Sequence, residues 1–163
     1  MHNEKFTVSS PAFKHSRAIP SKYANTGVLG GKNISLPLEW EHAPEGTKSF
    51  AISIIDLHPV ANNWVHWFVI NIPDTVTSIQ EGATTTNKLP HGAKELNNSF
   101  EKLGYGGPQP PKGTGVHKYE ITMYALNVKK IDLEIHTSLA KFLSALEGKI
   151  ISTARIIGVY ERL

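Results

Sequence analysis

Cysteine is absent from this chain of 163 residues. Disulfide bonds, thiolate catalysis and cysteine-based zinc sites are therefore excluded. Long apolar runs are also absent, since none approaches the roughly 18 residues that a membrane-spanning helix requires. The first ten residues, MHNEKFTVSS, carry charge but no apolar signal-peptide core. We therefore expect a cytoplasmic protein, although a mature chain that had lost a secretion signal would look the same.

Basic residues are few and scattered. The formal net charge is +3, and the longest basic run is the pair Lys129 and Lys130. Nucleic-acid-binding proteins usually gather Lys and Arg on one face or stripe. We therefore expect no nucleic-acid partner and no more than a weak preference for anionic partners.

Strand-like segments separated by turn residues make up most of the sequence. Apolar residues make up 40% of the chain and charged residues 19%, which is typical of a globular protein, and the length favours one domain over residues 1–163. β-branched and aromatic residues predict strands over 48–56, 64–72, 117–126 and 154–162. Residues 73–116 form a long turn-rich segment, which in a compact domain indicates function or a missed element.

A helix is predicted over residues 137–149. Its apolar residues recur at helical spacing at Leu139, Phe142, Leu143 and Leu146. Thr137 or Ser138 can cap its start and Gly148 its end, and we expect it to continue through Ile151. The fold class is therefore mostly β, an antiparallel sandwich or barrel with a helix near the C-terminus.

Polar side chains fall at the ends of the three central strands. Because side chains alternate along a strand, Asp56 closes the apolar face of the first strand, and His117 and Tyr119 open that of the third. Alternation also places His66 on one face with Trp64, Phe68 and Ile70. If the first two strands are antiparallel neighbours, Asp56 and His66 meet at one edge. Each residue alone could be structural, but their common placement favours one polar cluster above an apolar floor.

The segment YGGPQPPKGTGVHKY, residues 105–119, leads into this cluster. Gly106 and Gly107 allow close approach of the backbone and a positive φ, and their N–H groups can form an anion-binding concavity. The prolines fix φ and make the loop rigid. We therefore interpret the loop as the preformed rim of a pocket that His117 and Tyr119 line. Three other histidines are interpreted as loop or surface residues: His58, His91 and His136.

The same residues resemble a known family. The segments IPSKYANTG, GGKNISLPLEW, APEGTKSFAISIID, WVHWFVINIP, YGGPQPPKGTGVHKY and ARIIGVYER occur in the order found in phosphatidylethanolamine-binding proteins, also called Raf kinase inhibitor-like proteins. The chain is most similar to their short bacterial branch. The resemblance implies a large central antiparallel sheet, a smaller flanking sheet and a C-terminal helix.

The resemblance also implies a small pocket that binds anions such as phosphate or phosphorylated headgroups. Eight residues of this chain fall on the family's motifs as ligand-binding residues: Asp56, Trp64, His66, Gly107, Pro108, Pro110, His117 and Tyr119. The chain departs from the first motif, in which Leu57 replaces a proline and His58 an aspartate, and Leu36 stands where a proline is usual. His58 adds a possible cation at the rim.

Two functions follow as hypotheses. The first is a non-enzymatic protein that binds a small anionic or phosphorylated ligand and has no cofactor, metal or catalytic residue. Such a protein could also modulate a kinase or protease partner, and a homodimer is possible. In it His66 and His117 donate hydrogen bonds, and Asp56 orients an imidazole. The alternative is an enzyme that uses Asp56, His66, His117 and Tyr119 for acid–base chemistry or to hold a metal.

Overall fold

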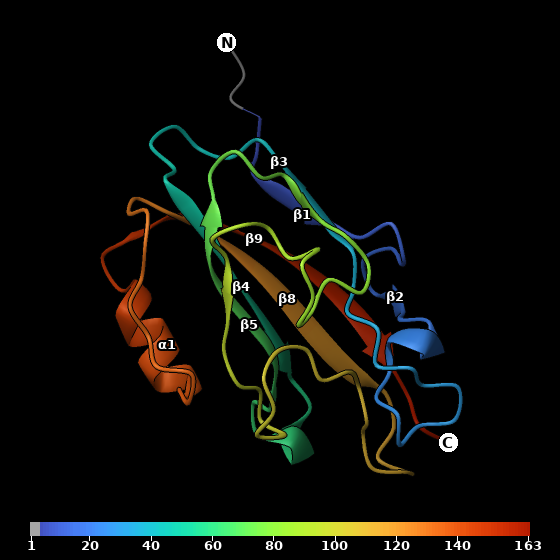
Figure 1. Cartoon of the computed structure of the whole chain (residues 1–163). Coiled ribbons are helices and arrows are strands. Elements are labelled where there is room, and N and C mark those ends of the chain that lie inside the picture. Colours follow the sequence, from blue (N-terminus) through green and yellow to red (C-terminus); the bar gives the residue numbers. More distant parts are fainter. Residues whose placement is uncertain (1–3) are drawn as a thin grey trace.

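Two β-sheets and one helix make up the structure, a computed structural model that describes residues 4–163 (Figure 1). The larger sheet has six strands in the order β2 (Arg17–Ala18), β9 (Ile150–Tyr160), β8 (His117–Leu126), β4 (Ser49–Asp56), β5 (Val65–Pro73) and β7 (Lys94–Glu95). The smaller sheet has three, in the order β1 (Thr7–Ser9), β3 (Leu38–Glu41) and β6 (Ser78–Ile79). Two short 3₁₀ helices are η1 (Ser21–Tyr23) and η2 (Pro59–Ala61), and the α-helix is α1 (Leu139–Leu146).

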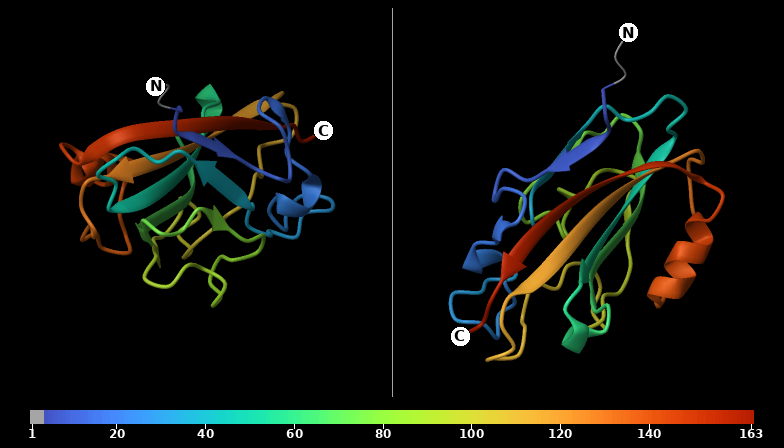
Figure 2. Two further views of the ribbon diagram at one scale, coloured as in Figure 1. Left: turned by 90° about the horizontal axis from the view of Figure 1, so that it is seen from above. Right: turned by 180° about the vertical axis from the view of Figure 1, so that it is seen from behind.

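The large sheet is buried on both faces, which gives three layers. One face packs on the small sheet, through contacts among Phe50, Ile52, Leu38, Trp40 and their neighbours. The other face packs on α1, which lies beside the sheet in Figure 1 and in both views of Figure 2. This double burial explains why the central strands read as nearly continuous apolar runs.

The predicted fold class is confirmed: the protein is mostly β, with two sheets and a C-terminal helix. All strand pairs in both sheets are antiparallel except β2 with β9. The central strands match the predicted ranges to within one residue, and β8 matches in full. The long segment 73–116 contains only the two-residue strands β6 and β7.

The predicted continuation of the helix through Ile151 is wrong. Ser138 caps α1, since its Oγ accepts a hydrogen bond from the N–H of Lys141 at 3.1 Å. After Leu146 the chain leaves helical geometry at Glu147, whose ψ is 130°, and then turns at Gly148, whose φ is +76°. Ile150 and Ile151 instead begin β9.

The prediction that side chains alternate strictly between the two faces along β5 is also wrong. The β4–β5 register passes from Ile54 opposite Trp67 to Ile55 opposite Val65, so His66 is an extra residue, a β-bulge. A bulge lets two successive side chains lie on one side of the sheet. His66 therefore shares a face with Asp56 and Tyr119, whereas Phe68 packs in the cluster under α1.

Phe142 contributes a stacked aromatic contact to the packing of α1 on the sheet. The rings of Phe142 and Phe68 stack with centroids 4.3 Å apart, and both side chains are fully buried. Phe142→Ala should lower the free energy of unfolding by about 3–5 kcal/mol because it leaves a cavity. Leu143 on the next helical position is 44% exposed, so Leu143→Ala should cost less than about 1 kcal/mol. Denaturant unfolding of both variants measures the difference, and equal losses would contradict this packing.

Candidate functional site

A pocket of about 430 Å³ opens at one end of the large sheet, where β4 ends and β5 and β8 begin. Such a volume suits a small molecule. Its wall combines the η2 turn, the strand ends and the loop before β8. The lining residues are Asp56, Val60, Ala61, Asn62, Trp64, His66, Phe100, Gln109, Pro110, Pro111 and Tyr119.

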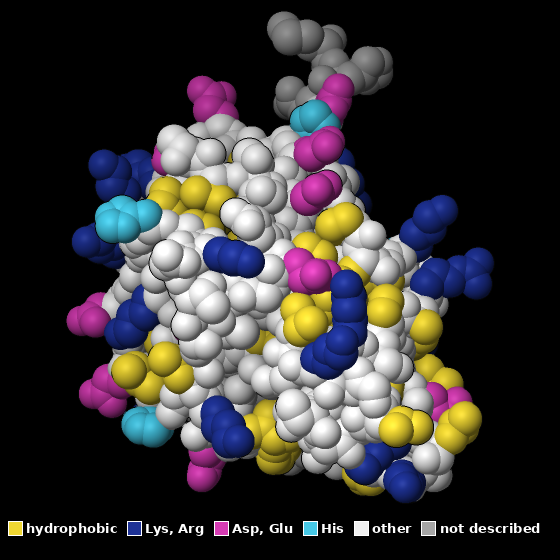
Figure 3. Space-filling view, turned by 45° about the vertical axis from the view of Figure 1, so that its right-hand side comes forward, with side chains coloured by type: hydrophobic (Ala, Val, Ile, Leu, Met, Phe, Trp, Pro, Cys, Tyr) yellow, Lys and Arg dark blue, Asp and Glu magenta, His cyan; other side chains and the backbone are white. Residues whose placement is uncertain are grey.

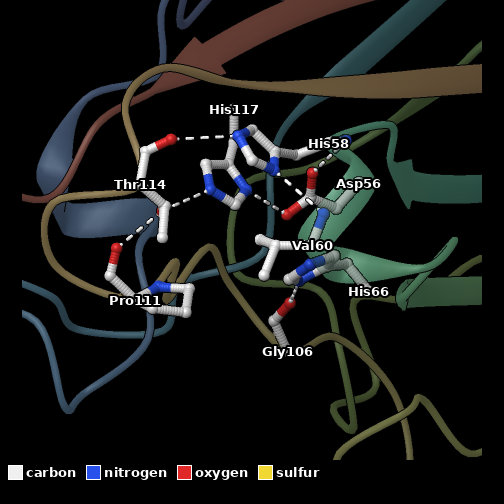
Figure 4. Close-up of polar contacts among 8 residues, drawn as sticks. All are labelled: Asp56, His58, Val60, His66, Gly106, Pro111, Thr114 and His117. Carbon is white, nitrogen blue, oxygen red and sulfur yellow. Dashed lines mark hydrogen bonds and ion pairs between the residues drawn. The ribbon is translucent and has the colours of Figure 1, made fainter.

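Asp56 and His117 form the polar centre of this end of the sheet (Figure 4). His117 Nδ1 lies 2.7 Å from Asp56 Oδ2, and both side chains are almost completely buried. Asp56 Oδ1 accepts a further bond from the N–H of His58 at 2.9 Å. The predicted role of Asp56, which orients an imidazole, therefore matches the geometry.

The other ring nitrogen of His117 is occupied as well. His117 Nε2 lies 2.8 Å from Thr114 Oγ1, and the Thr114 hydroxyl donates to the carbonyl of Pro111 at 2.7 Å. A hydroxyl has one proton, so Thr114 must accept from Nε2–H while it donates to Pro111. We therefore assign a proton to each nitrogen of His117, which makes it an imidazolium paired with the Asp56 carboxylate.

His58 belongs to this centre, contrary to its interpretation as a surface residue. Its ring stacks on His117 with centroids 3.9 Å apart and an interplanar angle of 9°. His58 Nδ1 accepts from the N–H of Val60 at 3.1 Å, and Nε2 donates to the carbonyl of Thr114 at 2.9 Å. Because one nitrogen accepts and the other donates, His58 is a neutral ring here. It joins the η2 turn to the glycine- and proline-rich loop and is not a cation at the rim.

His66 lies at the floor of the pocket. Its Nδ1 donates to the carbonyl of Gly106 at 2.6 Å. Burial lowers its pKa from 6.5 to about 4, although the bond to Gly106 and the Asp56 carboxylate act in the opposite direction. Near neutral pH His66 is therefore uncharged, with a lone pair on Nε2. Among residues 4–163, the hydrogen bond of ordinary geometry that the ring makes is the one from Nδ1 to Gly106, and the backbone of Gly107 lies near enough to raise its pKa as well.

Tyr119 pairs directly with Asp56 across β8 and β4 and lies beside His66, with ring centroids 5.1 Å apart. Its hydroxyl is buried and has no hydrogen-bond partner among the described residues. Burial, and then the neighbouring Asp56 carboxylate, raise the pKa of Tyr119. The group is therefore a protonated donor that faces the Asp56 carboxylate without a hydrogen bond of ordinary geometry to it, which is costly in a folded protein.

The glycine pair has a different role from the one predicted. Neither Gly106 nor Gly107 has a positive φ. The N–H of Gly106 donates to the carbonyl of His66 at 2.8 Å, and that of Gly107 donates to Asn33 Oδ1 at 2.7 Å. The predicted anion-binding concavity is therefore wrong, because both donors are used. Glycine is needed for close packing, since a Cβ on Gly107 would lie 2.1 Å from the Tyr23 carbonyl oxygen.

The eight predicted residues divide into two groups. Five line the pocket: Asp56, Trp64, His66, Pro110 and Tyr119. Three support its wall from behind: Gly107, Pro108 and His117, of which Pro108 accepts a hydrogen bond from the N–H of Asn25. The sequence reasoning missed Phe100, which packs edge-on against Trp64 and His66. It lies in a segment without periodicity, so no sequence signal marked it.

Charge at the pocket is close to balanced. None of its lining residues is Lys or Arg, and the one ionised group among them, Asp56, is paired with His117. On the face seen in Figure 3, Lys and Arg side chains are dispersed without a broad basic patch.

Within residues 4–163, no group of three or more His, Cys, Asp or Glu could hold a metal ion. No helix there is long and apolar enough to cross a membrane.

Two sheets with a pocket at one end of the larger sheet define a class of β-protein, and comparison with known proteins gives the family. The family model of phosphatidylethanolamine-binding proteins matches residues 9–161. The UPF0098 protein YbcL of Escherichia coli K12 is 38% identical over 160 residues, which cover 96% of this chain and 87% of YbcL. A UPF0098 protein of Methanothermobacter thermautotrophicus is 38% identical over 151 residues, 93% of this chain and 95% of that protein.

Comparison with solved structures gives the same family. The crystal structure of E. coli YbcL, described as a new member of the mammalian PEBP family, matches with a TM-score of 0.91 and 37% identity. The match covers 98% of this chain and all of that one. The chain therefore belongs to the phosphatidylethanolamine-binding protein family.

Burial of neutral His66 should make stability fall with acidification. Unfolded His66 binds a proton near pH 6.5, but folded His66 does so only near 4. Between these values the unfolded chain binds more protons, so lowering the pH favours unfolding, by up to about 3 kcal/mol for this residue. Denaturant unfolding at about pH 7 and pH 4 should show a smaller loss for His66→Gln than for the unchanged protein. Exposed His91 provides the control: a His91→Gln variant with the same reduction would contradict the assignment.

Packing of Gly107 should make it far less replaceable than other loop glycines. Its added Cβ would collide with the Tyr23 backbone, which cannot move aside easily. Gly107→Ala should therefore cost at least about 2 kcal/mol. Gly113 has open space around it and a φ of +77°, so Gly113→Ala should cost only about 1–2 kcal/mol of backbone strain. Unfolding free energies test this order, and a neutral Gly107→Ala would contradict it.

Proposed function

We propose that this protein is a non-enzymatic binding protein whose pocket holds the oxyacid head of a small ligand, such as a phosphate or carboxyl group. Membership of the phosphatidylethanolamine-binding protein family supports a binding role. The mixture of apolar walls with a few polar groups at the floor is typical of small-molecule sites.

The unpartnered hydroxyl of Tyr119 carries the proposal. A buried donor without an acceptor lowers stability, and such a group is retained where a ligand supplies the acceptor. The hydroxyl lies beside His66 and Asp56 at the floor, below Val60, Trp64 and Phe100. An oxygen of an oxyacid would accept its proton, while the rest of the ligand contacts the apolar wall.

The alternative of an enzyme has less support. Asp56, His117 and Thr114 lie in the order of a carboxylate–imidazole–hydroxyl triad. However, the Thr114 proton is donated to Pro111, and both nitrogens of His117 are engaged, so the group has no free base. For the same reason His117 cannot act as a metal ligand beside His66.

Three expectations stay predictions from the sequence: modulation of a kinase or protease, a homodimer and a cytoplasmic location.

Tyr119→Phe tests the proposed function. The binding of inorganic phosphate and of acetate, measured by titration calorimetry, should weaken about 10- to 100-fold, because the hydrogen bond that Tyr119 donates to an oxygen of the ligand is lost. Stability without ligand should be unchanged or higher, since the variant removes an unpaired buried hydroxyl. Tyr124 on the opposite face of β8 bonds Ser53, so Tyr124→Phe should leave binding unchanged. If neither anion binds the unchanged protein, the proposed function is wrong.

A further inference from the structure

The floor of the pocket offers one donor and one acceptor side by side. The donor is the hydroxyl of Tyr119, which has no partner among the described residues. The acceptor is Nε2 of His66, because Nδ1 carries the ring proton and donates it to Gly106. The two rings meet edge to face, with an interplanar angle of 81°. A ligand head that satisfies both atoms must accept one hydrogen bond and donate another.

The charged and titratable groups around His66 do not change this polarity. Asp56 at the end of β4 and His117 at the start of β8 face it, but they form an ion pair with each other. Tyr119 on β8 is a neutral donor, Phe100 contributes aromatic surface, and the other polar side chains of the lining, Asn62, Trp64 and Gln109, are uncharged. No Lys or Arg lines the pocket. A fully ionised anion would therefore place an oxygen lone pair against the lone pair of Nε2.

We propose that the pocket selects an oxyacid that keeps a proton on its head, as inorganic phosphate does at neutral pH and a phosphate monoester does in its monoanionic form, with its own O–H donating to His66 Nε2 and an ionised oxygen accepting from Tyr119. This specificity rests on the proposed function of the same site. A carboxylate would have to take up a proton on binding. Sulfate and phosphodiesters, which have no O–H at neutral pH, would be rejected because their oxygens leave Nε2 without a donor.

Protonation of His66 itself offers a ligand little help. With a pKa of about 4, roughly one molecule in a thousand carries imidazolium at pH 7. A ligand that needs the charged ring would lose affinity by about the same factor. A ligand that brings its own proton avoids this cost.

Phosphate and sulfate form the sharpest pair of probes, since they are alike in size and shape and differ in the proton. Titration calorimetry at about pH 7 should show at least ~100-fold weaker binding of sulfate, as sites that require a substrate hydroxyl reject analogues without it. Acetate binding, measured in two buffers of different ionisation enthalpy, should take up about one proton per ligand. Phosphate at a mildly acidic pH should bind without such uptake.

Two variants separate the acceptor from the donor. His66→Gln can turn an amide N–H₂ toward the ligand, so it should bind sulfate and phosphate within about tenfold of each other. Tyr119→Phe removes the shared donor and should weaken both ions, where binding is measurable, while it preserves their ratio. Thermal unfolding of each variant identifies one that fails to fold, in which case the phosphate-to-sulfate ratio and the acetate proton uptake of the unchanged protein decide alone.

The outcomes distinguish this inference from the proposed function. Absence of phosphate and acetate binding overturns both. Equal binding of phosphate and sulfate by the unchanged protein leaves the binding function in place and overturns the selection for a proton. Tight sulfate binding with uptake of one proton would show that His66 binds as imidazolium, which also overturns it.

Discussion

The hydrogen bond between Asp56 and His117 organises this end of the molecule. It joins the last residue of β4 to the first residue of β8 inside the protein, with almost no access to water. Because both groups are buried, neither can lose its partner without leaving an uncompensated charge, a strongly destabilising change. Through Thr114 the same imidazole fixes the glycine- and proline-rich loop, and through stacking it positions His58.

The pocket is defined by the hydrogen bonds that the protein leaves unmade. Asp56, His58, His117 and Thr114 use their polar atoms on one another or on backbone groups, and Gly106 and Gly107 use their N–H groups on His66 and Asn33. At the floor of the pocket, the hydroxyl of Tyr119 and Nε2 of His66 are the polar atoms that stay available to a ligand. In the proposed function, recognition therefore depends on two neutral groups of opposite polarity rather than on a cluster of positive charge.

His58 shows how one substitution within a family motif can be absorbed. A cation at this position would lie against the imidazolium of His117, on which the His58 ring stacks. The neutral ring avoids this repulsion, and its two nitrogens connect the η2 turn to the loop through Val60 and Thr114. The residue is thus part of the support of the pocket wall.

The sequence alone determined the fold class, the central strands, and the meeting of Asp56, His117 and Tyr119 at one end of the sheet, because apolar alternation and turn residues are local signals and the motif order indicated the family. Tertiary structure decided what each group can do. The bulge that turns His66 to the Asp56 face depends on register with β4, and Phe100 joins the wall only through the path of an aperiodic loop. Which nitrogen of His66 carries the proton depends on Gly106, and which nitrogen of His58 does so depends on Thr114; both partners are distant in sequence from the histidine. Protonation and hydrogen-bond capacity are properties of such long-range contacts, so no local pattern encodes them.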